Sequence, residues 1–376
     1  MPRLVALDLA GGDSFVAALQ RVWERGDAVL PIDQRLPSEA ATALIKQLGA
    51  ACVVDPSGEQ RLDGGAPTEH GDALVVATSG STGRPKGVVL THEAVAASAV
   101  ATSRRLAVTP GDHWLACLPL AHVGGLSVVT RALHTGTGLT VLPRFDAERV
   151  TLAAGAGATL TSLVATALSR IDPSLFRCIV VGGARPPAER PANTVTTYGM
   201  TETGSGVVYE GVPLDGVDVE IAPDGEVLLR GPMMSRGYRD GSTPIDPQGW
   251  LHTNDLGRLL PDGRLHVDGR RADLIISGGE NIWPDVIEAA LATHPRIADV
   301  GVGGIDDPEW GQRVVAWVVA ADSSNPPSLA ELREHVAKLL PAFMAPRSIV
   351  IVATLPRTSL GKLRRAALQT DVIPPM

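Results

Sequence analysis

Short apolar runs alternate with helical patterns through the first two-thirds of this chain. The runs include residues 74–78, 139–142, 159–168 and 178–181, and Gly, Pro, Asp or Asn bounds each of them. Runs of this kind between amphipathic segments are typical of strands buried on both faces. The pattern therefore predicts an α/β fold whose sheet is buried and largely parallel.

The pattern changes near Val217, where short stretches of alternating polar and apolar residues begin. Asp224-Gly225 and Asp262-Gly263 are dipeptides typical of hairpin turns. We therefore expect an antiparallel β subdomain over about residues 217–269, at the end of a large N-terminal domain of layered α/β sheets that spans residues 1–269.

The last hundred residues predict a small α+β domain. Pro284 suits the first turn of a helix, and Ser328 with Glu331 forms a capping box for another helix. Residues 314–320 and 349–352 have the character of strands.

We place a hinge at residues 270–273 and the C-terminal domain, which we expect to be mobile, at residues 274–376.

Aromatic residues are scarce, with 4 Phe, 6 Trp and 3 Tyr, while Gly (40) and Pro (29) are plentiful. With so few aromatic rings available, the hydrophobic core must be packed with small and branched aliphatic side chains. Because so few tyrosines are present, Tyr198, Tyr209 and Tyr238 each merit individual inspection.

The net charge and the cysteine content limit the cellular location and the binding partners that we expect for this protein. The net charge of −8 disfavours a nucleic-acid partner. The three cysteines are far apart, which indicates neither a disulfide framework nor a zinc site. The N-terminus is a poor signal peptide and no apolar run approaches membrane-spanning length, so we expect a cytoplasmic protein without membrane insertion. The sequence leaves open whether the protein forms a homodimer.

The segment TSGSTGRPKG, residues 78–87, carries the strongest chemical signal. Its glycines allow the backbone N–H groups to approach an anion closely. Its hydroxyls and lysine are donors suited to phosphate oxygens, and a helix could begin soon after it, at Thr91. The candidate phosphate ligands are Thr78, Ser79, Gly80, Ser81, Thr82, Gly83 and Lys86. The spacing differs from a Walker loop, and the chain has no HExxH, GxSxG or complete dinucleotide fingerprint.

This loop resembles the phosphate-binding signature of the adenylate-forming superfamily, which includes acyl-CoA synthetases, adenylation domains and firefly-type luciferases. Further motifs of that superfamily follow in the same order between residues 74 and 366. PLAHVGGL (residues 119–126) is similar to the family's aromatic/histidine motif, which implies that His122 gates the acyl pocket or orients the carboxylate.

Two central motifs of the family imply an adenine site and a metal site. GGARP begins with Gly182, Gly183 and Ala184, whose backbone would lie against the adenine ring. TYGMTETG, residues 197–204, contains Tyr198 for adenine stacking, followed by Gly199, Thr201 and Glu202. Thr201 would bind the α-phosphate and Glu202 would ligate Mg²⁺.

The C-terminal motifs imply ribose binding, a thiol tunnel and a catalytic lysine. Asp255 and Arg270 match the family's ribose-binding residues, whereas the family's hinge position holds Ala272 here. Gly278 and Gly279 match the segment that forms the tunnel for the CoA thiol. Lys362, in PRTSLGKLRR, matches the catalytic lysine.

The resemblance implies two half-reactions with ATP, Mg²⁺ and coenzyme A. A small-molecule carboxylic acid attacks the α-phosphorus of ATP to give an acyl-adenylate and pyrophosphate, and the CoA thiol then displaces AMP to give the acyl-CoA thioester. Between the two steps the C-terminal domain would rotate, withdrawing Lys362 from the site.

The finer resemblance is to short o-succinylbenzoate–CoA ligases of menaquinone biosynthesis. It rests on residues 161–168, VVGGARP and residues 199–217. A ligase for another aromatic or fatty acid stays open, as does an enzyme that loads a carrier protein. A luciferase-like oxygenase and a nucleotide-sensing regulator are the remaining alternatives.

Overall fold

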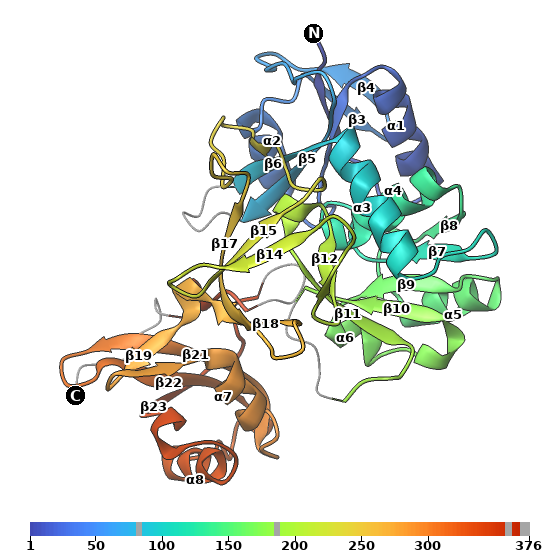
Figure 1. Cartoon of the computed structure of the whole chain (residues 1–376). Helices are drawn as coiled ribbons and strands as arrows, with labels where there is room; N and C mark the ends of the chain where they lie inside the picture. The colour runs from blue at the N-terminus through green and yellow to red at the C-terminus, as the bar shows by residue number, and fades with distance from the viewer. Residues whose placement is uncertain (80–84, 184–188, 358–362, 369–376) are drawn as a thin grey trace. The chain divides into compact units, whose positions relative to one another are not determined.

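The computed structural model describes residues 1–79, 85–183, 189–357 and 363–368 (Figure 1). The chain forms two compact units, each with its own core. The first unit comprises residues 1–220, 228–253 and 259–266, and the second comprises residues 221–227, 254–258 and 267–376. No helix in the described ranges combines the length and the apolar character needed to cross a bilayer.

The first sheet of the N-terminal unit has the strand order β16-β6-β5-β2-β1-β3-β4. Its strands are β1 (Leu4–Leu7), β2 (Ala28–Pro31), β3 (Cys52–Asp55), β4 (Gly58–Arg61), β5 (Asp72–Ser79), β6 (Pro85–Thr91) and β16 (Gly237–Tyr238). Strands β3, β1, β2 and β5 run parallel, whereas β4, β6 and β16 join antiparallel. The predicted parallel sheet is therefore confirmed at the centre of this layer.

The second sheet has the order β13-β12-β11-β10-β9-β7-β8. Its strands are β7 (His113–Ala116), β8 (Gly138–Val141), β9 (Leu160–Leu163), β10 (Cys178–Val181), β11 (Thr194–Gly199), β12 (Gly206–Tyr209) and β13 (Val212–Pro213). Strands β8, β7, β9, β10 and β11 are parallel. The predicted run at 159–168 divides into β9 and a short helix, since only its first half is extended.

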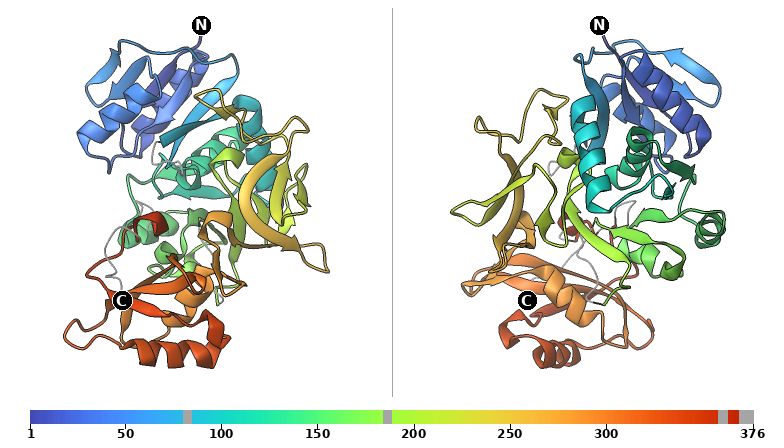
Figure 2. Two further views of the ribbon diagram at one scale, coloured as in Figure 1. Left: turned by 90° about the vertical axis from the view of Figure 1, so that its left-hand side faces the viewer. Right: turned by 45° about the vertical axis from the view of Figure 1, so that its right-hand side comes forward.

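The helices of this unit are α1 (Asp13–Glu24), α2 (Ser38–Gln47), α3 (His92–Arg105), α4 (Val123–Thr135), α5 (Ala147–Gly155) and α6 (Ala165–Leu168). Figure 2 shows them around the sheets from two further sides. Aliphatic side chains such as Leu4, Leu30 and Leu44 fill the first core, and Leu115, Val150 and Ile179 contribute to the second. This packing agrees with the aliphatic core predicted from the scarcity of aromatic residues.

A small sheet of order β14-β15-β17-β18 contains both predicted hairpin turns. Its strands are β14 (Asp218–Ile221), β15 (Glu226–Arg230), β17 (Leu251–Leu259) and β18 (Leu265–Arg270). The N–H of Gly225 donates to the carbonyl of Ala222, and the N–H of Gly263 donates to that of Leu260, each at 2.8 Å. Both turn glycines have positive φ, which explains why Asp-Gly marks these positions.

The second unit is built on a sheet of order β20-β19-β22-β21, in which β23 also pairs with β22. The strands are β19 (Ile275–Ser277), β20 (Glu280–Ile282), β21 (Ile297–Asp307), β22 (Gly311–Ala320) and β23 (Ser348–Ile351), with helices α7 (Pro284–Leu291) and α8 (Leu329–Leu339). Alternate residues of β22 face opposite sides. Val314 packs with α7 and α8, whereas Trp317 packs with Leu363 and Leu368.

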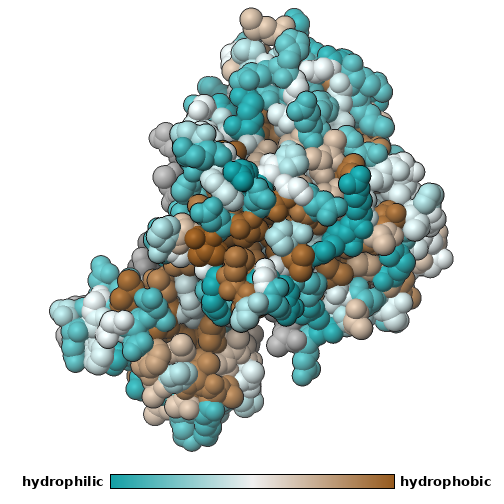
Figure 3. Space-filling model, in the orientation of Figure 1, coloured by the Kyte–Doolittle hydropathy of each residue, from teal (hydrophilic) through white to brown (hydrophobic). Residues whose placement is uncertain are grey.

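Local signals in this unit are confirmed. Pro284 is the first residue of α7, and Ser328 and Glu331 form the expected capping box at the start of α8. A groove of about 280 Å³ lies beside α7 and β21, and its lining includes Ala289, Ala292 and Val300. Apolar surface is visible around α7 in Figure 3.

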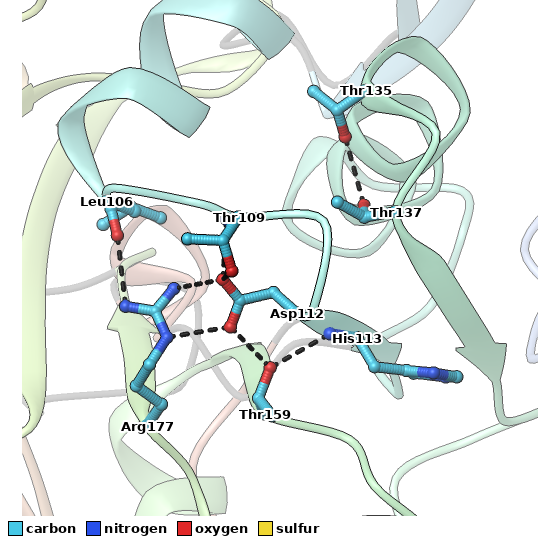
Figure 4. Close-up of polar contacts among 8 residues, drawn as sticks. All are labelled: Leu106, Thr109, Asp112, His113, Thr135, Thr137, Thr159 and Arg177. Atoms are coloured by element: carbon cyan, nitrogen blue, oxygen red, sulfur yellow. Dashed lines mark hydrogen bonds and ion pairs between the residues drawn. The ribbon is translucent and has the colours of Figure 1, made fainter.

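A polar cluster joins strands at one end of the second sheet (Figure 4). Asp112, 5% exposed, accepts hydrogen bonds from Nε and Nη2 of Arg177, both at 2.8 Å, and from the hydroxyl of Thr159 at 2.8 Å. Oδ2 of Asp112, which accepts from Nη2 of Arg177, also accepts from the N–H of Thr109 at 2.8 Å. Burial would raise the pKa of Asp112, but these hydrogen bonds lower it to about 2. The cluster is structural, because every group in it is paired with another.

Candidate active site

The predicted phosphate loop joins two antiparallel strands. Thr78 lies opposite Lys86 in the pairing of β5 with β6. Ser79 ends β5, and the candidate residues Gly80, Ser81, Thr82 and Gly83 lie outside the described residues. Strand β6 separates the loop from α3, so the loop does not run directly into a helix. Thr91 is the N-cap of α3, accepting from the N–H of Ala94 at 3.1 Å.

Close packing explains the glycine that follows Lys86. A Cβ at Gly87 would lie 2.8 Å from Cγ1 of Val75 and 3.0 Å from Cδ2 of Leu48. The absence of a side chain at Gly87 therefore allows β6 to pack closely against Val75 and Leu48. This packing places Lys86, the preceding residue, at the base of the loop.

The segment 197–204 forms the end of β11 and the short 3-10 helix η2 (Thr201–Thr203). A Cβ at Gly199 would lie 2.2 Å from the carbonyl oxygen of Ser205, so only glycine fits there. The hydroxyl of Thr203 donates to the carbonyls of Met200 and Ser205, at 2.9 and 2.6 Å. These contacts fix the turn that carries Thr201 and Glu202.

Tyr198 precedes this turn on β11 and is half-buried. It lies opposite Val208 of β12, and the pairing shifts by a bulge between Tyr198 and Gly199. Gly182 and Gly183 follow β10, which is the neighbour of β11, and Gly183 has φ of 86°. The third candidate of that motif, Ala184, lies outside the described residues.

Tyr238 joins two of the predicted site residues, and sequence reasoning assigned it no role. Its hydroxyl donates to Oε1 of Glu202 at 2.9 Å. The ammonium of Lys86 lies 4.4 Å from the centroid of its ring, within cation–π range. Tyr238 therefore links the phosphate loop to η2, and the only sequence signal for it is the scarcity of tyrosine.

His122 is the N-cap residue of α4, and its Nε2 lies 3.4 Å from Oδ2 of Asp33. Burial lowers the pKa of His122, and this effect exceeds the opposing influence of Asp33. Burial therefore favours the neutral form of the imidazole. Arg35 donates to Asp33 through Nε and Nη2, at 2.8 and 2.7 Å. Asp33 follows β2, 89 residues before His122, and sequence reasoning missed it.

Arg131 of α4 is a second residue that sequence reasoning missed. It is 2% exposed, and its guanidinium donates to the hydroxyls of Ser205 and Ser162. Burial lowers the pKa of Arg131. No carboxylate among the described residues pairs with it. Its Cζ also lies 5.4 Å from the centroid of the Trp114 ring, within cation–π range. A buried cation with no charged partner among the described residues is costly, and a bound anion would offset that cost.

The second unit holds the predicted ribose ligands together. Asp255, on β17, is 5% exposed, and its Oδ1 lies 2.9 Å from Nε of Arg270 at the end of β18. Asn254, just before Asp255, has φ of 58°, and its N–H donates to Oε1 of Glu226 at 2.7 Å. The structure therefore brings these two residues, 15 positions apart in the sequence, into contact.

The predicted tunnel segment follows in the same unit. Gly278 and Gly279 form the turn between β19 and β20, with φ of 60° and 82°. The N–H of Gly278 donates to the carbonyl of Trp310 at 2.8 Å. Lys362 lies outside the described residues. Residues 271–273 form a short 3-10 helix, η3 (Arg271–Asp273), within the predicted hinge.

Comparison with known proteins identifies the class. The model of the AMP-binding enzyme family matches residues 63–239, and that of the AMP-binding enzyme C-terminal domain matches residues 286–362. A relative from Mycobacterium tuberculosis is 40% identical over 89% of this chain and 96% of its own length. The chain therefore belongs to the AMP-binding enzyme family, as its motifs predicted.

The names of the relatives are more specific. The Mycobacterium tuberculosis protein is named as a probable 2-succinylbenzoate–CoA ligase. A 2-succinylbenzoate–CoA ligase from Bacillus cereus is 36% identical, over 78% of this chain and 69% of its own. The solved structure of o-succinylbenzoate CoA synthetase from Bacillus subtilis with its acyl-adenylate has a TM-score of 0.88 and 29% identity, covering 99% of this chain and 88% of that one.

Proposed function

We propose that this chain is an ATP-dependent 2-succinylbenzoate–CoA ligase that acts through an acyl-adenylate. The observation that carries the proposal is the 40% identity to the Mycobacterium tuberculosis relative, which extends over 96% of that relative. The similarity thus covers the acid-binding part of the chain as well as the nucleotide motifs. The Bacillus subtilis structure, whose ligand is the acyl-adenylate of the same acid, adds support.

Adenylation requires two anions to meet, so catalysis depends on positive charge and hydrogen-bond donors. Lys86 and the loop residues 78–83 would bind the outer phosphates of ATP, and Thr201 would bind the α-phosphate. Asp255 would accept hydrogen bonds from the ribose hydroxyls, beside Arg270. Lys362 would offset the charge that develops at the α-phosphorus.

Glu202 is a suitable ligand for the magnesium ion that adenylation with ATP would require. Mg²⁺ prefers one or two carboxylates together with phosphate oxygens, and Glu202 is a carboxylate whose orientation Tyr238 fixes. When bound, the ion would neutralise charge on the phosphates of ATP. The Bacillus subtilis enzyme has been solved with ATP and a magnesium ion, at 28% identity and a TM-score of 0.86, covering 98% of this chain and 89% of that one.

The second half-reaction transfers the acyl group from AMP to the thiol of CoA. The thiolate attacks the carbonyl carbon of the mixed anhydride, the bond to the phosphate oxygen breaks, and AMP leaves. We propose that rotation about residues 270–273 brings Gly278 and Gly279 to the acyl-adenylate, where a backbone without side chains admits the pantetheine arm. Lys362 would leave the site in the same movement.

Arg131 favours an acid with a second negative group. 2-Succinylbenzoate carries two carboxylates, of which only one is activated, so the other needs a cation inside the protein. Arg131 is buried and bonded to Ser205, which immediately follows the adenylate motif. A fatty acid or a simple benzoate would leave this guanidinium without an anionic partner. Arg131 thus supports a dicarboxylic acid over the alternative substrates.

We also propose that the enzyme works in the cytoplasm, where the three buried free cysteines would stay reduced. The test of function is pyrophosphate release and CoA-thioester formation with a panel of acids. The proposal predicts both products, with 2-succinylbenzoate preferred. Release of pyrophosphate without a CoA product would favour carrier loading, and no release with any acid would favour a nucleotide sensor.

A further inference from the structure

We infer that Tyr238 is a positioning residue that holds Lys86 and Glu202 close to each other while preventing them from pairing directly. The inference rests on the proposed function, in which Lys86 binds phosphate and Glu202 binds the metal ion. One side chain contacts both charges: the ring lies under the ammonium, 4.4 Å away, and the hydroxyl donates to the carboxylate at 2.9 Å. Within the described residues, no ion pair joins Lys86 to Glu202.

The backbone around Tyr238 is fastened to the same two elements. The N–H of Ser235 donates to the carbonyl of Glu202 at 2.7 Å, and the N–H of Arg239 donates to the carbonyl of Gly87 at 2.7 Å. Between them, Tyr238 pairs with Val88 as β16 joins β6. The segment 235–239 therefore spans from η2 to the strand that carries Lys86.

Arg239 anchors this segment to the rest of the first sheet. Its guanidinium donates to three backbone carbonyls, those of Leu48, Ala66 and Pro67, at 3.2, 2.7 and 2.7 Å. Its neighbour Arg236 donates to both oxygens of the buried Asp72, at 3.1 and 3.0 Å. These arginine contacts hold the backbone on both sides of Tyr238, and the hydrogen bond to Glu202 orients its side chain.

The chemistry of a phenol explains why this residue suits the place. An ammonium and a carboxylate that pair directly would each lose part of the charge that the substrate needs. A ring attracts the cation through its face, and a neutral hydroxyl satisfies the anion, so both charges keep their sign and their net attraction for ligands. Lys86 thus keeps its charge for phosphate, and Glu202 keeps its charge for the metal ion.

Two substitutions separate the two contacts. Tyr238→Phe keeps the ring and removes the hydroxyl, so Mn²⁺ binding in the presence of ATP should weaken about fivefold, while ATP binding without metal stays within twofold. Tyr238→Leu removes both contacts and lets the two ions pair. ATP binding in EDTA should then weaken about tenfold.

The double variant gives the sharpest outcome. Adding Glu202→Gln to Tyr238→Leu removes the carboxylate of Glu202, while the exposed Asp240, whose charge also interacts with Lys86, is present in every variant. Metal-free ATP binding should therefore return to within about threefold of the wild-type protein. A tyrosine that only supports the fold would give no such recovery. Tyr209→Phe is the matched control, because its buried hydroxyl contacts Thr102 at 3.4 Å and, within the described residues, no contact joins it to Lys86 or Glu202.

The experiment uses the full chain, with calorimetry for ATP in EDTA and electron paramagnetic resonance for Mn²⁺ with ATP. Unchanged Mn²⁺ binding in Tyr238→Phe would overturn the inference, even if the leucine variant failed to fold. The inference would also be overturned if a folded Tyr238→Leu, Glu202→Gln double variant did not recover metal-free ATP binding. Neither measurement needs an acid, so a wrong substrate assignment leaves both readouts intact.

Discussion

Replacing Arg131 with methionine should remove the enzyme's preference for a second carboxylate on its substrate. Methionine keeps an unbranched side chain of similar length in the buried site but removes the charge. In the wild-type protein Arg131 is 2% exposed, and among the described residues its guanidinium donates hydrogen bonds to the hydroxyls of Ser162 and Ser205. Binding of a dicarboxylic acid would give this charge an anionic partner in a site that excludes water.

The size of the effect follows from that burial. Removing one partner of a buried, hydrogen-bonded charge pair costs about 2–5 kcal/mol. We therefore expect kcat/KM for 2-succinylbenzoate to fall by at least about 30-fold. The free protein should lose little stability, about 1 kcal/mol or less, because the substitution also removes a buried cation for which the described part of the chain offers no charged partner.

The assay measures CoA-thioester formation with 2-succinylbenzoate and with the same molecule lacking its ring carboxylate. The monocarboxylate should be used almost equally by the wild-type protein and by Arg131→Met, within about threefold. Denaturant unfolding of both proteins provides the stability control. An equal loss of kcat/KM for both acids, together with a large loss of stability, would show that Arg131 is a structural residue and does not bind the second carboxylate.

Two further predictions concern catalysis and the fold. Lys362→Ala should abolish adenylation yet spare thioester formation from a supplied acyl-adenylate. Equal loss of both half-reactions would show that Lys362 has no specific role in adenylation. Asp112→Asn should reduce the free energy of unfolding by about 2.5 kcal/mol at pH 7, since the pKa of Asp112 falls from 3.8 to about 2. A folded-state pKa below the unfolded one gives stability that is present above about pH 4 and is lost as the pH falls through about 2. Urea unfolding at pH 7 and at lower pH measures this difference, and a difference that grows toward low pH would contradict it.

Local signals in the sequence predicted local structure well. The capping box at Ser328, the Asp-Gly turns at Asp224 and Asp262, and the strand at residues 178–181 all depend on residues close together in the chain. Such signals act within a few residues, so the printed sequence already contains their physical cause.

Contacts between distant residues were not predictable in this way. Tyr238 meets Glu202 across 36 residues, and His122 meets Asp33 across 89 residues. No local period relates these partners, because the order of the strands in each sheet brings them together. Strand β6 was missed as well, because a loop rich in glycine and proline precedes its short apolar run. The family resemblance identified the separate motifs, and the structure adds the side chains between them.

The identity of the acid is tested by the rate of CoA-thioester formation by the full chain with ATP, Mg²⁺, CoA and a panel of carboxylic acids. We predict that 2-succinylbenzoate gives the highest kcat/KM, with AMP and pyrophosphate released in equal amounts. A higher kcat/KM for a fatty acid or for a simple aromatic acid would contradict it.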